Sequence, residues 1–112
     1  MDKQCTIDLQ DYRIPGSRVL AGRERGFEAR EASKIDTLAK ECETVTIIIP
    51  DDMGAVTPSF LEPFLYNAVL HLRPENFFRK FKFQNNGRYK IDDDLFEAVD
   101  RIVSQESSLA PY

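Results

Sequence analysis

The sequence predicts an α/β protein with a small, mostly parallel or mixed four-stranded sheet covered by about three helices. Three observations lead to this fold class. A run of β-branched apolar residues occupies 45–49, segments with strand character alternate with segments of helical composition, and no internal repeat or low-complexity linker interrupts this order. Right-handed crossovers between the strands would then build one small sheet.

The length and composition are those of one ordinary globular domain. The chain has 112 residues, of which 42% are hydrophobic and 30% are charged. We expect a single domain over residues 1–112, with a core at about 5–104 and a frayed tail at 105–112. The net charge of −4 argues against a dedicated nucleic-acid binder, because duplex binding depends on the neutralisation of phosphates.

The cysteine content and the N-terminal sequence predict a cytoplasmic protein. Cys5 and Cys42 are the only cysteines and show neither CxxC spacing nor a histidine cluster, which predicts two reduced thiols. The N-terminal sequence has no apolar segment of signal-peptide length, and no window reaches the length of a membrane span. Contact with a membrane is therefore not expected.

The N-terminal part is expected to supply an edge strand, a turn and a helix. Residues 5–9 alternate and are rich in β formers, which predicts a strand near the sheet edge. The turn signal Pro15-Gly16 predicts a hairpin, or a strand with a bent partner, over 11–20. Residues 27–43 have helix-forming composition and a narrow buried stripe. The stripe comprises Phe27, Ala32, Ile35, Leu38 and Cys42.

The central strand is expected at 45–49, where apolar residues are continuous rather than alternating. Continuous apolar strands are typical of sheets covered on both faces, so this strand is predicted to be central and covered on both sides. Function in such sheets usually follows the carboxyl end of a strand, which makes the loop 51–59 the first candidate site.

A second helix is predicted behind this loop, from Ser59 to about Leu72. Ser59 and Glu62 match a capping box, in which the two side chains satisfy free amides reciprocally. Pro63 then lies in the first turn or just past it, where the loss of an amide donor costs little. The apolar face is broad enough to pack on the sheet or to meet a second copy in a homodimer. It comprises Phe60, Leu61, Phe64, Leu65, Ala68, Val69 and Leu72.

The C-terminal part is predicted to form a connector, a strand and a helix. Residues 76–78 are predicted to form the connector. Residues 81–84 alternate between apolar and polar side chains, as in a half-buried strand. Residues 89–91 are expected to form a short extended segment. A helix begins at Asp92, where carboxylates favour the positive end of the helix dipole. Its core-facing residues are Leu95, Phe96, Val99, Ile102 and Val103. A basic-aromatic RNA surface around 73–83 is the alternative, but alternation favours a core role for Phe81 and Phe83.

The order of elements and the stretch 47–61 resemble STAS domains, and more closely the small bacterial STAS-like proteins. STAS anti-sigma-factor antagonists open the corresponding helix with Asp-Ser-Ser-Gly-Leu. Matching that motif to this chain pairs it with Thr57, Pro58, Ser59, Phe60 and Leu61, so Ser59 takes the place of the phosphorylatable serine. The Gly-Arg-x-x-Gly segment of the STAS-like group is reproduced by Gly22, Arg23 and Gly26, and the resemblance covers roughly 6–103. The chain departs from the antagonist motif in three places, where Thr57 replaces Asp, Pro58 replaces Ser and the bulky Phe60 replaces Gly.

The resemblance implies a non-enzymatic regulatory module that acts by protein-protein contact and partner switching. The partner would be an ATPase-type anti-sigma kinase or a related signalling protein. Ser59 is the phosphoacceptor candidate, since a phosphate at a helix N-terminus meets free amides but adds about −2 charge to a docking face. The simpler interpretation is that Ser59 only caps the helix. The expected partner-binding residues are Asp51, Asp52, Met53, Thr57, Ser59, Phe60 and Glu62.

A second candidate site lies in the segment 22–30, whose glycines and arginines could hold an anion. Its residues are Gly22, Arg23, Arg25, Gly26 and Arg30. The alternative function is therefore a small nucleotide- or nucleic-acid-binding protein, although the interleaved glutamates favour an ion-paired surface. The sequence shows no nucleophile beside a base, no metal-ligand cluster and no cofactor loop, so we expect no enzymatic activity, no metal and no cofactor.

Overall fold

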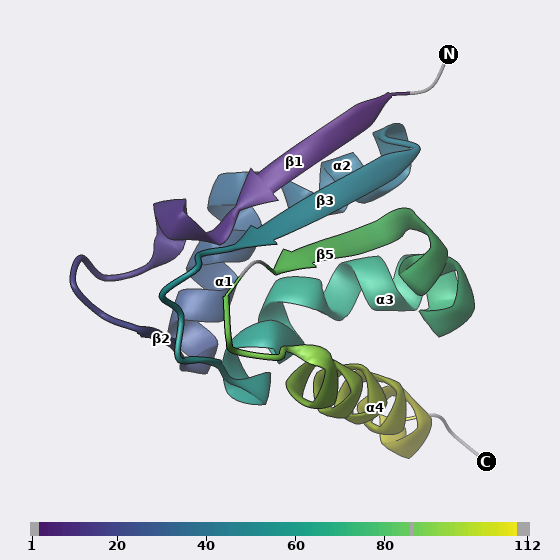
Figure 1. Ribbon diagram of the computed structural model, residues 1–112. Helices are drawn as coiled ribbons and strands as arrows, with labels where there is room; N and C mark the ends of the chain where they lie inside the picture. The colour runs from purple at the N-terminus through teal and green to yellow at the C-terminus, as the bar shows by residue number, and fades with distance from the viewer. Residues whose placement is uncertain (1–2, 86, 110–112) are drawn as a thin grey trace.

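A computed structural model describes the backbone of residues 3–85 and 87–109 and the side chains up to residue 105 (Figure 1). The elements are β1 (Gln4–Asp8), the 3-10 helix η1 (Leu9–Tyr12), β2 (Val19–Leu20), α1 (Arg23–Ser33), α2 (Ile35–Glu41), β3 (Thr44–Ile49), β4 (Ala55–Val56), α3 (Pro58–Lys80), β5 (Phe81–Asn85) and α4 (Asp92–Leu109). The α/β class predicted from the alternation of strands and helices is confirmed.

The strands form two parallel sheets instead of the single four-stranded sheet that was expected. The larger sheet has the order β1-β3-β5, with β3 central as predicted, and its arrows end at one edge (Figure 1). Ile47 pairs with Ile7 on one side and with Phe83 on the other. The smaller sheet is a short ladder in which Val19 and Leu20 of β2 pair with Ala55 and Val56 of β4.

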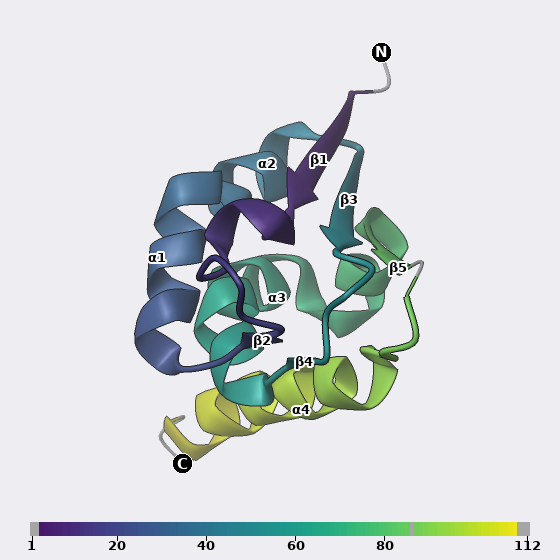
Figure 2. The ribbon, with the colours of Figure 1, turned by 60° about the vertical axis from the view of Figure 1, so that its left-hand side comes forward.

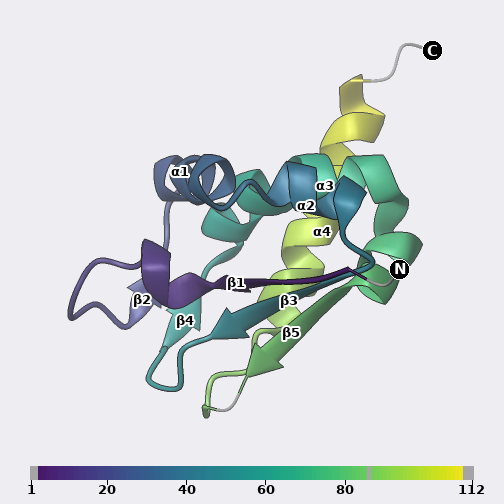
Figure 3. The same ribbon diagram turned by 90° about the horizontal axis from the view of Figure 1, so that it is seen from above.

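The larger sheet is covered on one face, so the expectation of cover on both faces is wrong. α1, α2 and α3 lie on the same side of the strands (Figure 3). Along β3, Val45, Ile47 and Ile49 are buried on that side, whereas the alternate residues are only half-buried. The other face carries one polar row of Thr6, Thr46 and Lys82 and a second row of Asp8, Ile48 and Gln84. Ile48 is the only apolar member of these rows, which explains why β3 looked uniformly apolar while its neighbours keep this face polar.

A disulfide joins Cys5 and Cys42, which corrects the prediction of two reduced thiols. Cys5 pairs in register with Val45 at the start of β3, and Cys42 lies three residues before Val45 at the end of α2. Parallel pairing of β1 with β3 therefore brings together two cysteines that are 37 residues apart. Disulfides are rare in cytosolic proteins, so the bond does not support the expected cytoplasmic location.

The N-terminal part differs from the prediction in three ways. Instead of a hairpin over 11–20, η1 is followed by a strand that pairs with β4. The expected helix over 27–43 is divided into α1 and α2 by Lys34, which has φ 58°. α1 begins at Arg23, and its buried positions are Gly26 and Ala29. Phe27 is 41% exposed instead of buried, and the guanidinium groups of Arg23 and Arg30 lie over its ring.

α3 begins earlier and ends later than predicted. Thr57 is its N-cap, with the hydroxyl accepting a hydrogen bond from the Phe60 amide, and Pro58 occupies the first helical position. The expected end near Leu72 is a kink, because Arg73 has φ 68° and the helix resumes to Lys80. The expected connector 76–78 is thus helical. Its Phe77 is fully buried and stacks on Phe81 with ring centroids 4.7 Å apart.

α4 begins at Asp92 as predicted and packs along α3 at the side of the molecule (Figure 1). Leu95, Val99 and Ile102 are buried, but Phe96 is 58% exposed, which corrects its assignment to the core. The helix continues through residues 105–109, where a frayed tail was expected, and 110–112 lie outside the described residues. Residues 89–91 form no strand. Among the described helices, none is long and apolar enough to cross a membrane.

Candidate functional site at the carboxyl edge of the sheet

The loop 51–54 after β3 is held in place by two arginines from the segment between β1 and β2. Arg13 donates to both carboxylate oxygens of Asp52, at 2.8 and 3.2 Å. These hydrogen bonds hold the pKa of the Asp52 carboxyl below its usual range. Arg18 donates from Nε to the Asp52 carbonyl oxygen at 3.2 Å, and its own carbonyl accepts from the Gly54 amide at 2.6 Å. The loop is therefore exposed but anchored at several points.

The chain between this loop and α3 is tied to the chain that enters α1. β4 pairs with β2, and the Thr57 amide donates to the Leu20 carbonyl at 2.9 Å. The same alignment places the beginnings of α1 and α3 side by side, next to β2 and β4 (Figure 2). The Tyr89 hydroxyl bonds to the Val56 carbonyl and to Asp94, and so joins β4 to the start of α4. Two short strands thus position three helix starts.

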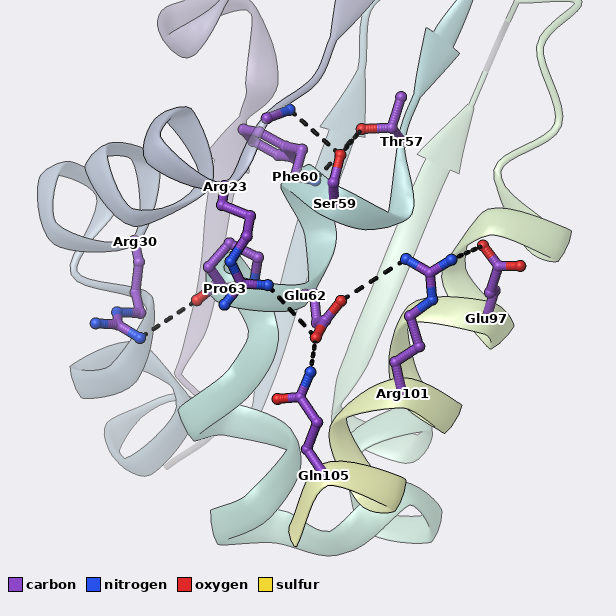
Figure 4. Close-up of polar contacts among 11 residues, drawn as sticks. Arg23, Arg30, Thr57, Ser59, Phe60, Glu62, Pro63, Glu97, Arg101 and Gln105 are labelled. Atoms are coloured by element: carbon purple, nitrogen blue, oxygen red, sulfur yellow. Dashed lines mark hydrogen bonds and ion pairs between the residues drawn. The ribbon is translucent and has the colours of Figure 1, made fainter. Parts of the chain in front are cut away.

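Ser59 lies where α1 and α3 begin, although it is not the cap of α3. Its hydroxyl accepts from the Gly22 amide at 3.4 Å and lies 2.9 Å from the Thr57 hydroxyl (Figure 4). Gly22 is the N-cap of α1 and Thr57 is the N-cap of α3. The half-buried Ser59 side chain therefore sits between the positive ends of two helix dipoles.

The predicted capping box is wrong because Glu62 points into the protein. Its residue exposure is 4%, and it is the one buried charged residue among those described. The carboxylate lies 3.5 Å from Arg23 and 3.9 Å from Arg101, and it accepts a hydrogen bond from Gln105 (Figure 4). Glu62 consequently joins α3 to both α1 and α4.

The residues of the expected anion site at 22–30 are largely engaged in helix packing. The Gly26 amide donates to the Gly22 carbonyl inside α1, and the α-carbon of Gly26 faces the Phe60 carbonyl. Arg23 contacts Glu62, and Arg30 donates to the Pro63 carbonyl at 3.3 Å. Arg25, which has no hydrogen bond or ion pair in the described part of the chain, lies on α1 near Glu24 and Glu28. The structure therefore does not gather these residues around one open loop.

The expected partner-binding residues divide into an accessible group and a buried group. Asp51 and Asp52 are exposed, and Thr57 and Ser59 are half-buried. Met53, Phe60 and Glu62 are buried at 3%, 0% and 4% exposure, so they support the surface from below. Phe60 therefore does not project beside Ser59 as a bulky obstacle.

The contacts that the sequence did not predict join segments far apart in the chain. Arg13 and Arg18 reach the loop from the N-terminal side, while Arg101 and Gln105 reach Glu62 from α4. No local motif marks them, because each contact joins residues at least 34 positions apart. The expected core role of the aromatic residues is confirmed, since Phe81 is buried, Phe83 is half-buried and Lys82 is exposed on the other face.

Comparisons of the sequence with models of protein families and with curated proteins find no match, and a comparison with solved structures finds none either. The STAS-like resemblance therefore stays a prediction, and the function is argued from the site.

Proposed function

We propose that this protein is a non-enzymatic regulatory module of the STAS-like kind, which acts by protein-protein contact and is switched by phosphorylation of Ser59. The contact surface is the exposed loop around Asp51 and Asp52 together with the first turn of α3. The observation that carries the proposal is the position of the Ser59 hydroxyl between the N-caps of α1 and α3.

The surroundings of Ser59 suit a phosphoryl group. The hydroxyl is already within bonding distance of one backbone amide, and the two helix dipoles point their positive ends toward it. Arg23 follows Gly22 in sequence and keeps 55% of its side chain exposed, so its guanidinium can turn to a phosphate. A phosphate on Ser59 would add about −2 charge at the start of α3.

The added negative charge determines which kind of partner the surface binds. The loop already presents two carboxylates, one of which is compensated by Arg13. A phosphate on Ser59 repels a partner that offers acidic side chains and strengthens the contact with a basic one. The proposed partner is an ATPase-type anti-sigma kinase or a related signalling protein, which both docks on this surface and phosphorylates it.

The proposal implies a cytoplasmic module, because the phosphate comes from ATP, whereas the disulfide is of a kind that is rare in the cytosol. Cys5 and Cys42 lie at the amino edge of the sheet, at the opposite end of the strands from the loop and Ser59. Either redox state of the pair is therefore compatible with the geometry of Ser59.

Site-specific photo-cross-linking in the cells that encode the protein tests the contact surface. A benzophenone amino acid at Asp51 is expected to form an adduct with a second protein, while the same group at the exposed Glu31 of α1 forms none. Mass spectrometry identifies the adduct. Equal adducts at both positions, or none at Asp51, would contradict the proposed surface.

A further inference from the structure

We propose that a groove at the carboxyl edge of the sheet binds the phosphoryl group of a small phosphorylated molecule, held by Arg18 and Arg88. This site is separate from Ser59 and does not depend on phosphorylation of the protein. It also differs from the segment 22–30, whose Arg23 and Arg30 contact α3.

The groove lies where the loop after β3 meets the loop after β5. It has a volume of about 740 Å³, within the range of about 300–1,000 Å³ that is common for ligand pockets. Its lining includes Arg18 and Asp52 together with Gly87 and Arg88. Parallel sheets commonly bind ligands outside the carboxyl ends of their strands, and this groove lies at that edge of β3 and β5.

Arg18 is held in position before any ligand arrives. Its carbonyl accepts hydrogen bonds from the amides of Gly54 and Ala55, at 2.6 and 3.2 Å. Its Nε donates to the Asp52 carbonyl at 3.2 Å. Within the described part of the chain, its two terminal nitrogens have no hydrogen-bond partner. An arginine fixed at its backbone and at Nε loses little side-chain entropy when those terminal nitrogens bind an anion.

Arg88 supplies the second cation from the opposite loop. No hydrogen bond or ion pair engages its exposed side chain in the described residues. The spacing of the two loops is fixed next to it, because a β-carbon at Gly87 would lie 2.2 Å from the Asp51 carbonyl oxygen. Only glycine permits this approach, which holds the start of Arg88 against the loop after β3.

The groove keeps a net positive charge although acidic residues line it. The Asp52 charge is compensated by the two hydrogen bonds from Arg13, whose side chain is 12% exposed. Arg18 and Arg88 then face the single uncompensated carboxylate of Asp51. Two guanidinium forks favour a phosphoryl group over a carboxylate, because three phosphoryl oxygens can serve two arginines whereas one fork already occupies both oxygens of a carboxylate.

A titration followed by amide NMR spectra tests this site with inorganic phosphate, AMP and adenosine at constant ionic strength. We expect phosphate and AMP to shift the Gly54 and Gly87 signals saturably, and adenosine to leave them unchanged. Arg88→Gln is expected to weaken phosphate and AMP binding at least tenfold. This variant removes no contact seen among the described residues, so it should keep the native spectrum. Arg18→Gln should weaken binding to a similar extent.

Arg79→Gln is the matched control, because Arg79 is an exposed arginine just before β5, at the opposite edge of the sheet. Its affinity for phosphate and AMP should stay within twofold of the wild type. The proposal is overturned if neither phosphate nor AMP gives a saturable shift, if adenosine binds as well as AMP, or if Arg79→Gln weakens binding as much as Arg88→Gln.

Discussion

Glu62 shows how one residue can join several elements of a small domain. Burial of a carboxylate is unfavourable unless charged or polar partners replace its hydration, and Arg23, Arg101 and Gln105 provide these partners. Both arginine side chains remain about half exposed, whereas the Glu62 carboxylate that accepts from them is buried. Its effect is to connect the first turn of α1 and the N-terminal part of α3 with α4.

Substitution of Glu62 by Gln is expected to lower the free energy of unfolding by about 1–3 kcal/mol. The reason is that it removes the negative charge that pairs with both arginines and that accepts the hydrogen bond from Gln105. Glu97→Gln is the control, since Glu97 bonds to the same Arg101 at 3.3 Å but is 53% exposed. That change should stay within about 0.5 kcal/mol. Urea unfolding of the two variants measures both values, and an equal loss would refute the role given to Glu62.

Gly26 is expected to tolerate no side chain, although alanine normally stabilises a helix by about 1 kcal/mol relative to glycine. A β-carbon there would lie 2.3 Å from the Phe60 carbonyl oxygen and 2.5 Å from Pro63. Gly26→Ala should therefore lower the free energy of unfolding by about 1–3 kcal/mol as α1 and α3 are pushed apart. Thermal unfolding checks this, with the exposed substitution Glu31→Ala as the neutral reference. A higher melting temperature for Gly26→Ala would contradict the close contact.

The raised pKa of the Tyr89 hydroxyl leads us to expect a loss of stability at alkaline pH. Burial, followed by the hydrogen bond to Asp94, raises the pKa of the Tyr89 hydroxyl above its usual value near 10. Below the unfolded pKa of about 10, tyrosine is protonated in both states and the contribution of Tyr89 to stability is fully present. As the pH rises from about 10 through the folded pKa, the unfolded chain ionises first, so this contribution is lost. Chemical unfolding between pH 9 and about 12 should therefore show a steeper decline for the wild type than for Tyr89→Phe. Parallel curves for the two proteins would show that Tyr89 has no raised pKa.

The errors at residue scale come from side chains that serve distant elements instead of local ones. Ser59 and Glu62 have the spacing of a capping box, yet Thr57 provides the cap because Pro58 suits the first helical position. Glu62 then faces Arg101, a residue that the local sequence cannot bring near it. The loop 51–59 could be predicted as a candidate site from its place after a strand, but the contacts by which Arg13 and Arg18 hold it could not.

At the scale of elements, strands and helix starts were predictable where composition and pattern agree. β3, β5 and the start of α4 follow β-branched residues, alternation and an acidic first turn. The helix interruptions were not predictable, because Lys34 and Arg73 adopt positive φ values of 58° and 68° that these residue types rarely take. The β2-β4 ladder was missed for another reason, since two-residue strands carry no period.

The disulfide is the covalent link between elements, and it joins β1 to the junction of α2 and β3. A bond between residues 37 positions apart restricts the unfolded chain and contributes roughly 3–4 kcal/mol. Reduction should lower the urea midpoint of the oxidised protein accordingly. A Cys5→Ser and Cys42→Ser double variant should unfold like the reduced protein and show no response to reductant. Alkylation of both thiols in the untreated native protein would contradict the bond.

At the scale of the whole molecule, the sequence was sufficient to predict the α/β class but not which faces of the sheet the helices cover. The apolar run at 45–49 suggested two covered faces, whereas the helices lie on one face and the other carries Thr6, Thr46 and Lys82 (Figure 3). The pairing of β1 with β3 decides which residues share a face, and pairing is a long-range property. The same order of strands places the loop after β3, the start of α3 and Ser59 at one edge, which is the basis of the proposed contact surface.

Phosphopeptide mass spectrometry shows whether Ser59 is phosphorylated. The protein is incubated with Mg²⁺-ATP and the kinase that cross-links at Asp51, with Ser59→Ala as the control. We expect phosphate on Ser59 in the wild type and none in the variant. An active kinase that phosphorylates itself or another substrate but leaves Ser59 unmodified would overturn the proposed switch.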